Sequence, residues 1–236
     1  MNIALIGYGK MGKAIEKEAE ARGHHIVLIT STTPELEALK TADVAIEFSR
    51  PEAAFKNLKL CLENQLSVVC GTTGWLEKRN TIEKICQDRG AAFLYASNFS
   101  VGVNIFFEIN RRLAQLMAPY SDYEVQIEEI HHTQKLDAPS GTAISLAQDI
   151  IDETDKTSWT LNEKKQKDQI PIQAKRSEDV LGIHTVTYRL SIDEIQIKHQ
   201  AYNRQGFALG ALLAAEWIKG KKGVFSMKEV LGISLK

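Results

Sequence analysis

Cysteine is scarce in this sequence, and the few cysteines present form no pattern. The 236 residues include three, Cys61, Cys70 and Cys86, an odd number without the paired spacing of metal ligands. This argues against a disulfide framework and against a zinc site. We therefore expect no metal, and we expect the three thiols to pack as small apolar side chains.

An excess of charge of one sign and long hydrophobic runs are also lacking. Lys and Arg number 29 against 30 Asp and Glu, which argues against a nucleic-acid partner and against a polybasic membrane surface. No apolar run approaches the roughly 20 residues that a membrane-spanning helix needs. The chain begins directly with the strand-like residues 2–6 and shows no leader pattern, so we expect a cytoplasmic protein that starts at Met1.

The first half of the chain alternates short apolar runs with amphipathic segments. Strands are expected at residues 3–6, 26–30, 44–48, 67–70 and 91–95, and helices at 11–22, 52–64 and 76–89. This alternation predicts a parallel sheet with helices on both faces, a doubly wound α/β fold of the Rossmann type. A chain of 236 residues is long enough for one large domain or two small ones.

The pattern changes after Tyr95. Apolar residues occupy every second position of 123–128 and of 194–198, which is the period of a sheet with one face in water. These segments predict a second, mixed sheet. Between them, the strongly polar stretch 152–169 is interpreted as a solvated, mobile loop rather than a binding patch. A last apolar helix is expected at 207–219.

The first expected strand and helix are joined by a glycine-rich segment, Gly7-Tyr8-Gly9-Lys10-Met11-Gly12. This is the context that a dinucleotide-binding motif requires. Gly7 permits a tight turn, Gly9 lets the backbone approach a pyrophosphate, and Gly12 allows close packing of helix on strand, while the helix N-terminus offers free N–H groups. The segment also fits an ordinary strand-to-helix turn, but its βαβ context favours cofactor binding.

The cofactor of such a motif would be NADH or NADPH. An acidic residue that hydrogen-bonds the adenosine ribose of NAD is expected about 20 positions after the motif. The sequence there is Thr30-Ser31-Thr32-Thr33. Because the missing carboxylate removes both a partner for the 2′-hydroxyl and a repulsion against a 2′-phosphate, we favour NADPH.

Two more loops follow expected strands, Phe48-Ser49-Arg50-Pro51 and Gly71-Thr72-Thr73-Gly74. In an open parallel sheet, ligands lie outside the carboxyl ends of the strands, where both loops fall. Either loop also fits plain turn chemistry. Their shared placement favours a role in ligand binding.

The segment from His131 to Ala143 carries the most distinctive chemistry. It contains two imidazoles at the end of an expected strand, a lysine four positions after the first, and a Pro-Ser-Gly-Thr turn that opens a helix. Imidazole and ammonium groups donate protons, and a helix N-terminus binds anions. Each residue alone is more often a structural histidine or a solvated lysine, but together they fit a substrate that bears carboxylates.

This segment resembles the signature of the 4-hydroxy-tetrahydrodipicolinate reductases. Residues 97–104 resemble the family stretch that joins two domains, and further motifs follow in the family's order from Gly7 to Gly232. The resemblance covers nearly the whole chain. It implies that the chain uses NADH or NADPH to reduce 4-hydroxy-tetrahydrodipicolinate, through its dehydrated imine, to tetrahydrodipicolinate on the route to diaminopimelate and lysine.

The resemblance also implies a division of labour along the chain. Residues 1–99 and 207–236 would form the dinucleotide-binding domain. Residues 100–206 would form an inserted α+β domain that binds the cyclic dicarboxylate substrate and builds a homotetramer.

The resemblance further implies roles for single residues. His131 would be a proton donor or acceptor and Lys135 a proton donor, while His132, Gly141 and Thr142 would hold the substrate carboxylates. The cofactor would contact Gly7, Tyr8, Gly9, Lys10, Met11, Gly12, Phe48, Ser49, Arg50, Gly71, Thr72, Thr73, Ala96, Ser97, Asn98 and Phe99.

The sequence departs from the family pattern near the expected cofactor site. Glu47-Phe48-Ser49 stands where Asp-Phe-Thr is common, and residues 30–43 form a shorter stretch than in many members and lack their acidic residue. The remaining histidines, His24, His25, His184 and His199, receive no catalytic assignment.

Two other interpretations of the sequence stay open. A different two-domain Rossmann dehydrogenase, acting on an amino-acid semialdehyde or a sugar, would explain the glycine motif and the second sheet but would give Lys135 and residues 139–142 no specific role. A non-catalytic dinucleotide-sensing module would bind the cofactor without turnover. The presence of both His131 and Lys135 argues against that module.

Overall fold

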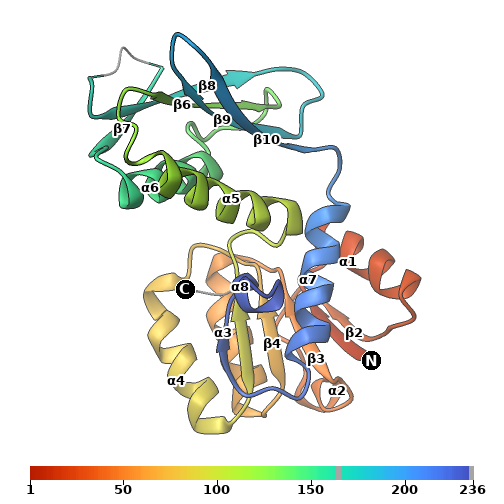
Figure 1. Ribbon diagram of the computed structural model, residues 1–236. Helices are drawn as coiled ribbons and strands as arrows, with labels where there is room; N and C mark the ends of the chain where they lie inside the picture. The colour runs from red at the N-terminus through yellow and green to blue at the C-terminus, as the bar shows by residue number, and fades with distance from the viewer. Residues whose placement is uncertain (163–165, 234–236) are drawn as a thin grey trace. The chain divides into compact units, whose positions relative to one another are not determined.

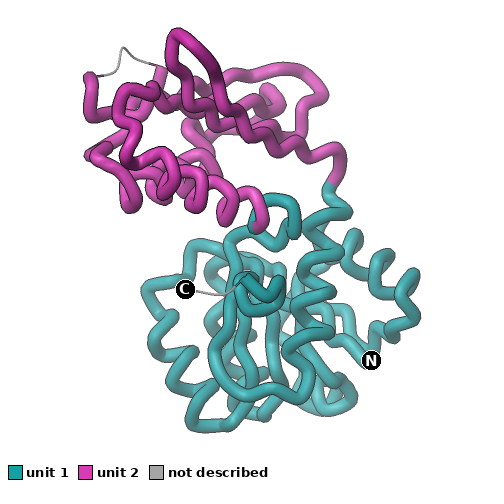
Figure 2. Tube along the Cα trace, viewed as in Figure 1, with its two compact units in different colours: residues 1–104, 204–236 teal, residues 105–203 magenta. Residues whose placement is uncertain are grey.

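The computed structural model describes residues 1–162 and 166–233, and the chain divides into two compact units (Figure 1). Unit 1 comprises residues 1–104 and 204–236, and unit 2 comprises residues 105–203 (Figure 2). The first boundary falls inside helix α5 (Val101–Met117), and the second falls just before helix α7 (Gln205–Ile218). The assignment of one ligand to each unit stays a prediction.

Unit 1 is built on a six-stranded sheet with the order β11-β5-β4-β3-β1-β2. Its strands are β1 (Asn2–Ile6), β2 (His25–Thr30), β3 (Val44–Glu47), β4 (Ser67–Cys70), β5 (Ala92–Tyr95) and β11 (Gly223–Phe225). Every neighbouring pair is parallel. Strands β3, β4 and β5 are buried along their whole length, because a parallel sheet carries helices on both faces.

The helices of unit 1 pack on opposite faces of this sheet. They are α1 (Lys10–Ala21), α2 (Leu36–Leu39), α3 (Pro51–Glu63), the short helix η1 (Leu76–Lys78), α4 (Arg79–Arg89), α7 and α8 (Met227–Val230). Ile3 and Leu5 of β1 pack in one cluster with α1 and α7, whereas Ala4 and Ile6 pack in another with α3 and α4. Because alternate residues of one strand serve both clusters, the sheet is doubly wound, as the sequence predicted.

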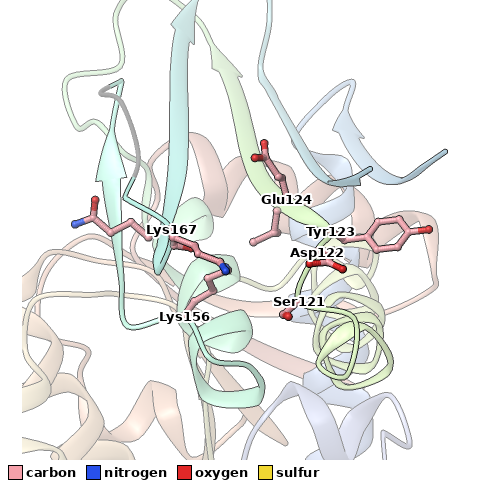
Figure 3. Close-up of a pocket in the computed structure, with 8 residues that line it drawn as sticks. Ser121, Asp122, Tyr123, Glu124, Lys156 and Lys167 are labelled. Carbon is pink, nitrogen blue, oxygen red and sulfur yellow. The ribbon is translucent and has the colours of Figure 1, made fainter. Parts of the chain in front are cut away.

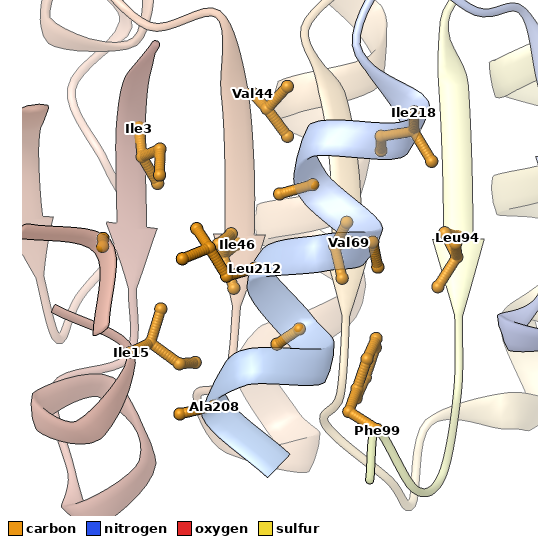
Figure 4. Close-up of a cluster of buried hydrophobic side chains, with 14 of the residues drawn as sticks. Ile3, Ile15, Val44, Ile46, Val69, Leu94, Phe99, Ala208, Leu212 and Ile218 are labelled. Carbon is orange, nitrogen blue, oxygen red and sulfur yellow. The ribbon is translucent and has the colours of Figure 1, made fainter. Parts of the chain in front are cut away.

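Helix α7 returns the chain from unit 2 to unit 1. Its buried residues include Ala208, Leu212 and Ile218, which lie over Ile46 and Val69 of the sheet (Figure 4). Removing a leucine or isoleucine side chain of this kind from water stabilises the fold by roughly 2 kcal/mol. The last helix therefore belongs to the core of the first unit.

Unit 2 contains a mixed five-stranded sheet with the order β10-β9-β6-β8-β7. Its elements are β6 (Glu124–His131), β7 (Ser158–Leu161), β8 (Gln169–Arg176), β9 (Gly182–Arg189), β10 (Glu194–Ala201), the greater part of α5, and α6 (Gly141–Glu153). Strand β6 pairs in parallel with β8 and antiparallel with β9. The prediction of a second, mixed sheet is confirmed.

One face of β6 packs against the hydrophobic core of unit 2. Val125, Ile127, Glu129 and His131 are buried, while the residues between them are partly exposed. Side chains of α5 and α6 pack on the two apolar members of this face. The same face therefore ends, toward the carboxyl end of β6, in two ionisable residues.

The prediction of a mobile loop over 152–169 is wrong in part. Helix α6 extends to Glu153, and β7 pairs in parallel with β8. Hydrogen bonding to a neighbouring strand thus outweighs the polar composition on which the prediction was based. Residues 163–165 of the predicted loop lie outside the described residues.

The remaining composition-based predictions concern membranes and thiols. Within residues 1–162 and 166–233, no helix is both long enough and apolar enough to span a membrane. Cys61, Cys70 and Cys86 are free and buried, as expected.

Candidate functional site

In unit 1, the expected cofactor residues follow the carboxyl ends of neighbouring strands. Loops 7–9, 48–50, 71–73 and 96–99 come after β1, β3, β4 and β5, which adjoin one another in the sheet. Strands β1 and β3 are neighbours although β2 separates them in sequence, so the strand order reverses between them. Doubly wound folds bind ligands in the crevice at such a switch point.

The turn after β1 requires glycine at two positions and leaves a third open. Gly7 has a φ of 98°, and a Cβ there would stand 2.1 Å from the carbonyl oxygen of Phe48. A Cβ at Gly12 would stand 2.3 Å from the carbonyl oxygen of Gly7. A Cβ at Gly9, which is the N-cap of α1, would meet nothing within 4 Å. The start of α1 is therefore open, which fits the approach of a pyrophosphate to its N–H groups.

Phe48 brings three of the expected loops together. Its carbonyl oxygen lies against Gly7, and its ring lies so close to Gly71 that a Cβ there would be 2.2 Å from it. The ring centroids of Phe48 and Phe99 are 5.5 Å apart. The hydroxyl of Thr72 is buried beside this group and has no hydrogen-bond partner among the described residues.

Ser49 is held by a buried carboxylate. Its hydroxyl donates to Glu47, which is 0% exposed and also accepts a hydrogen bond from the Sγ of Cys70 at 3.3 Å. Burial, together with Glu47, raises the pKa of the Cys70 thiol. The ends of β3 and β4 are thereby linked through side chains.

The other expected cofactor residues lie nearer to the surface. The hydroxyl of Tyr8 donates to Glu16 of α1, and the side-chain oxygen of Asn98 accepts a hydrogen bond from Ser100 N at 2.9 Å. Met11 and Ala96 are half-buried. The exposed members of the set are Lys10, Arg50, Thr73 and Ser97.

In unit 2, the expected catalytic segment begins where β6 ends. His131 is the last residue of the strand, and the backbone N–H of Lys135 donates to the carbonyl of His132 at 3.1 Å, which folds the segment into a turn. Helix α6 then starts at Gly141 and is capped by Ser140, whose Oγ accepts from Ala143 N at 3.2 Å. The two histidines and the lysine therefore belong to one turn that leads into a helix.

A lysine–aspartate pair and an arginine brace this turn. The Nζ of Lys135 lies 2.8 and 2.9 Å from the two carboxylate oxygens of Asp137. Arg176, on β8, donates from Nε to the carbonyl of Lys135 at 3.3 Å and from Nη2 to the carbonyl of Asp137 at 2.7 Å. The hydrogen bond from Lys135 lowers the pKa of the Asp137 carboxyl.

The two residues expected to bind carboxylates through α6 lie in its first turn. A Cβ at Gly141 would meet nothing within 4 Å, so the space in front of the helix is open. Thr142 follows it and is half-buried. An open helix N-terminus with a serine cap suits an anionic group.

A buried carboxylate that the sequence did not single out lies beside His131. Glu129 is 0% exposed, and its two carboxylate oxygens accept from Ser140 N at 3.0 and 3.1 Å. Its Oε2 lies 3.6 Å from His131 Nδ1 and 3.6 Å from His184 Nε2. Its Oε1 lies 3.9 Å from Arg176 Nη1. The period of two in β6 was a signal for this arrangement, because residues 129 and 131 point to the same face.

Burial and neighbouring groups shift the pKa values of both His131 and Glu129. Burial, with the neighbouring His184, lowers the pKa of His131 to about 4. Burial raises the pKa of the Glu129 carboxyl, but His184 and the hydrogen bonds from Ser140 outweigh it, and the net shift is downward. At neutral pH, therefore, Glu129 is ionised and His131 is neutral.

Glu129, His131 and His184 offer three possible metal-ligand atoms within 4.8 Å of one another. The guanidinium of Arg176 and the N–H of Ser140 already supply Glu129 with positive charge and with hydrogen-bond donors. A metal ion would have to compete with both groups. The donor set therefore fits a hydrogen-bonded ionic cluster better than a metal centre.

A cavity of about 280 Å³ lies elsewhere in unit 2, beside the start of β6 rather than its end. Lys156 and Lys167 lie on one side of it, and Ser121 and Asp122 lie on the other (Figure 3). The ammonium of Lys156 already donates to the carbonyl of Lys167 at 2.9 Å. The cavity contains none of the expected site residues, so the candidate substrate site stays with the His131 turn.

Comparison with known proteins identifies the family. Residues 1–99 match the family described as "Dihydrodipicolinate reductase, N-terminus", and residues 102–231 match "Dihydrodipicolinate reductase, C-terminus". The chain belongs to the dihydrodipicolinate reductase family. The family and the enzyme class predicted from the sequence are thereby confirmed, and this membership implies NADH or NADPH as the reductant.

Individual relatives in the dihydrodipicolinate reductase family agree over almost the full chain. A 4-hydroxy-tetrahydrodipicolinate reductase of Christiangramia forsetii is 54% identical over 98% of both chains, and one of Methanoregula boonei is 35% identical over 84% of this chain and 80% of its own. A solved dipicolinate-bound dihydrodipicolinate reductase from Paenisporosarcina has a TM-score of 0.78 and 25% identity, over 97% of this chain and 98% of that one. The predicted fold class is confirmed as well.

Proposed function

We propose that this reductase converts 4-hydroxy-tetrahydrodipicolinate, through its dehydrated imine, to tetrahydrodipicolinate with NADPH or NADH. The observation that carries the proposal is the turn from His131 to Thr142, where imidazoles, an ammonium and an open helix start lie within one segment. The names of the curated relatives support it. So does the dipicolinate, a ring with two carboxylates, in the related structure.

The substrate carboxylates are proposed to bind at the start of α6 and beside His132. The N–H groups of Gly141 and Thr142 would receive one carboxylate, because the first N–H groups of a helix have no partner within the helix. The side chains of His132 and Thr142 would add donors. A ring that carries two negative charges would thus be held before any chemistry occurs.

Lys135 and His131 are proposed to manage the protons of the reaction. Hydride arrival at an electron-poor ring carbon leaves negative charge on the ring, and a nearby proton donor neutralises it. Lys135 suits this role, because its ammonium lies in the same turn and is oriented by Asp137. His131, which is neutral at pH 7, suits proton exchange as an acceptor that then becomes a donor.

Unit 1 is proposed to hold the nicotinamide coenzyme at the ends of β1, β3, β4 and β5. The coenzyme, when bound, supplies the hydride. The open start of α1 would receive the pyrophosphate, and the loops gathered around Phe48 would line the rest of the site. After β2, residues 30–33 contain no carboxylate to repel a 2′-phosphate, so NADPH is the proposed preference.

A coupled assay tests this function. Freshly generated 4-hydroxy-tetrahydrodipicolinate is supplied as the substrate, and loss of reduced nicotinamide absorbance is followed with each coenzyme. We expect consumption that requires the ring and a larger kcat/KM with NADPH. No consumption with either coenzyme would contradict the function, whereas a strong preference for NADH would contradict only the coenzyme choice.

The same assay tests the proposed residues. Lys135→Ala and His131→Gln should each lower kcat by about 10²- to 10⁴-fold, which is the range of positioned acid–base groups. Lys175→Ala is a matched control, because Lys175 lies on β8 and pairs with Glu128 on the exposed side of the sheet. Wild-type turnover in both site variants would refute the assigned roles.

A further inference from the structure

Glu129 is a buried charge to which the mechanism above gives no task. Its side chain is 0% exposed, and an isolated carboxylate so placed would be strongly destabilising. Three other elements satisfy it, through Ser140 at the start of α6, His184 on β9 and Arg176 on β8. The carboxylate is thus the common partner of the elements that surround His131.

The arrangement of atoms around His131 distinguishes its two ring nitrogens. Nδ1 is fully buried, has no hydrogen-bond partner among the described residues, and lies 3.6 Å from Glu129 Oε2. The edge formed by Nε2 and Cδ2 faces Gly182, where a Cβ would lie 3.3 Å from each atom. An ionised carboxylate accepts hydrogen bonds and donates none, so it favours the tautomer with the proton on Nδ1. The lone pair then resides on Nε2.

We propose that Glu129 is a positioning residue, which fixes the Nδ1–H tautomer and the orientation of the His131 ring and ties that ring, through Ser140, to the N-terminus of α6. The inference rests on the proposed role of His131 in the reduction. One carboxylate thereby sets both the nitrogen that exchanges a proton and the helix start that receives a substrate carboxylate. Movement of either group relative to the other would require Glu129 to lose a partner.

His184 completes this arrangement from the neighbouring strand. Its Nε2 lies 3.1 Å from Ser140 Oγ, and its ring is 5.0 Å from that of His131 at an interplanar angle of 69°. The ionisable groups that face Glu129 are therefore His131, His184 and Arg176, and Lys135 adds its charge near His131. Burial and His184 keep the pKa of His131 low. At pH 7 the ring is therefore neutral and carries its proton on only one of its two nitrogens.

The decisive variant is Glu129→Gln. Glutamine keeps the shape and still accepts from Ser140 N, but its amide donates a hydrogen bond toward Nδ1 and so favours the opposite tautomer. We expect kcat to fall by about 10²- to 10⁴-fold, the scale seen where a histidine base is held in the wrong tautomer. The KM for the ring should stay within about threefold of wild type. In ¹⁵N NMR, with the His131 signals assigned through His131→Gln, the ring should change from Nδ1–H to Nε2–H.

Two further variants serve as controls. Glu128→Gln alters the adjacent residue of β6, whose carboxylate pairs with Lys175 on the other side of the sheet, and it should change neither kcat nor tautomer. Glu129→Asp keeps the charge, so His131 should retain the Nδ1–H tautomer. Its kcat should lie between that of Glu129→Gln and that of the wild type. If Glu129 had only a structural role, its substitution would not change the tautomer of His131.

The outcomes separate this inference from the proposed function. Absence of turnover in the wild-type protein contradicts the function, whereas the tautomer of wild-type His131 is measured without turnover. The inference is overturned if folded Glu129→Gln keeps wild-type kcat, or if its His131 retains Nδ1–H. Should Glu129→Gln fail to fold, an Nε2–H tautomer in the wild-type protein overturns it, and an Nδ1–H tautomer that Glu129→Asp preserves supports it.

Discussion

At the scale of single residues, the imidazole proposed to exchange protons lies where burial disfavours its charged form. His131 is 7% exposed, and its pKa is lowered to about 4 by burial and by His184. Glu129, two residues away, stays ionised because its neighbours outweigh the cost of burial. Perturbed pKa values of this kind are common at acid–base sites.

This arrangement predicts how stability depends on pH. The pKa of His131 falls from 6.5 in the unfolded chain to about 4 in the fold, so between these values the unfolded chain binds more protons. Stability should therefore decrease as the pH falls through this window, by about 1 to 2 kcal/mol between pH 7 and pH 5. Urea unfolding at both pH values should show a smaller difference for His131→Gln. An equal difference in both proteins would contradict the assignment.

The sequence singled out the proposed catalytic residues but not the residues that contact them. His131, His132 and Lys135 stand out by type and spacing alone. Arg176 and His184 become neighbours only through strand register, which pairs His131 with Arg176 and Glu129 with His184. Register depends on contacts distant in sequence, so no local pattern could predict these pairs.

At the scale of elements, two helix starts carry the proposed ligand contacts. Helix α1 begins after Gly9 and helix α6 begins at Gly141, and a Cβ at either glycine would meet nothing within 4 Å. Both starts are open toward a ligand. Gly7 and Gly12, by contrast, are needed for packing.

Substitutions of Gly9 and Gly141 are expected to affect different ligands, the coenzyme and the ring respectively. Gly9→Ala and Gly141→Ala should both fold, with melting temperatures within a few degrees of wild type, because the added methyl meets no protein atom. Gly9→Ala should weaken coenzyme binding by about tenfold or more, equivalent to about 1.4 kcal/mol, and spare the KM of the ring. Gly141→Ala should do the reverse. Steady-state kinetics with each ligand varied in turn checks the pair, and identical effects of both variants would count against the proposed sites.

Most elements of unit 1 were predictable, and several of unit 2 were not. The βα alternation of the first half gives strands and helices distinct periods. Strand β8 contains Pro171, which argues against a central strand, yet β8 pairs with β6 and β7 on its two sides. Strand β7 was not predicted, because it lies within the polar stretch 152–169. In both cases pairing with a neighbour decided the structure, and composition did not.

At the scale of the whole molecule, the sequence of unit 2 is inserted within the sequence of unit 1. Helix α7, which follows unit 2 in the sequence, contributes to the core of unit 1, so the first 104 residues alone lack part of that core. The resemblance to the family implies that unit 2 also builds a homotetramer.

The oligomeric state is a separate prediction. Light scattering after size-exclusion chromatography should give a mass four times the 26.4 kDa of one chain. A mass of one or two chains at assay concentration would contradict the tetramer and leave the chemistry untouched.

The central claim is that this chain delivers a hydride from a reduced nicotinamide to the ring of a cyclic dicarboxylate. Coenzyme deuterated at its transferable position, supplied with freshly generated 4-hydroxy-tetrahydrodipicolinate, tests this directly by mass spectrometry of the product. The account predicts tetrahydrodipicolinate that carries one deuterium, formed in step with coenzyme oxidation. Product without deuterium, or no product from a folded protein, would contradict it.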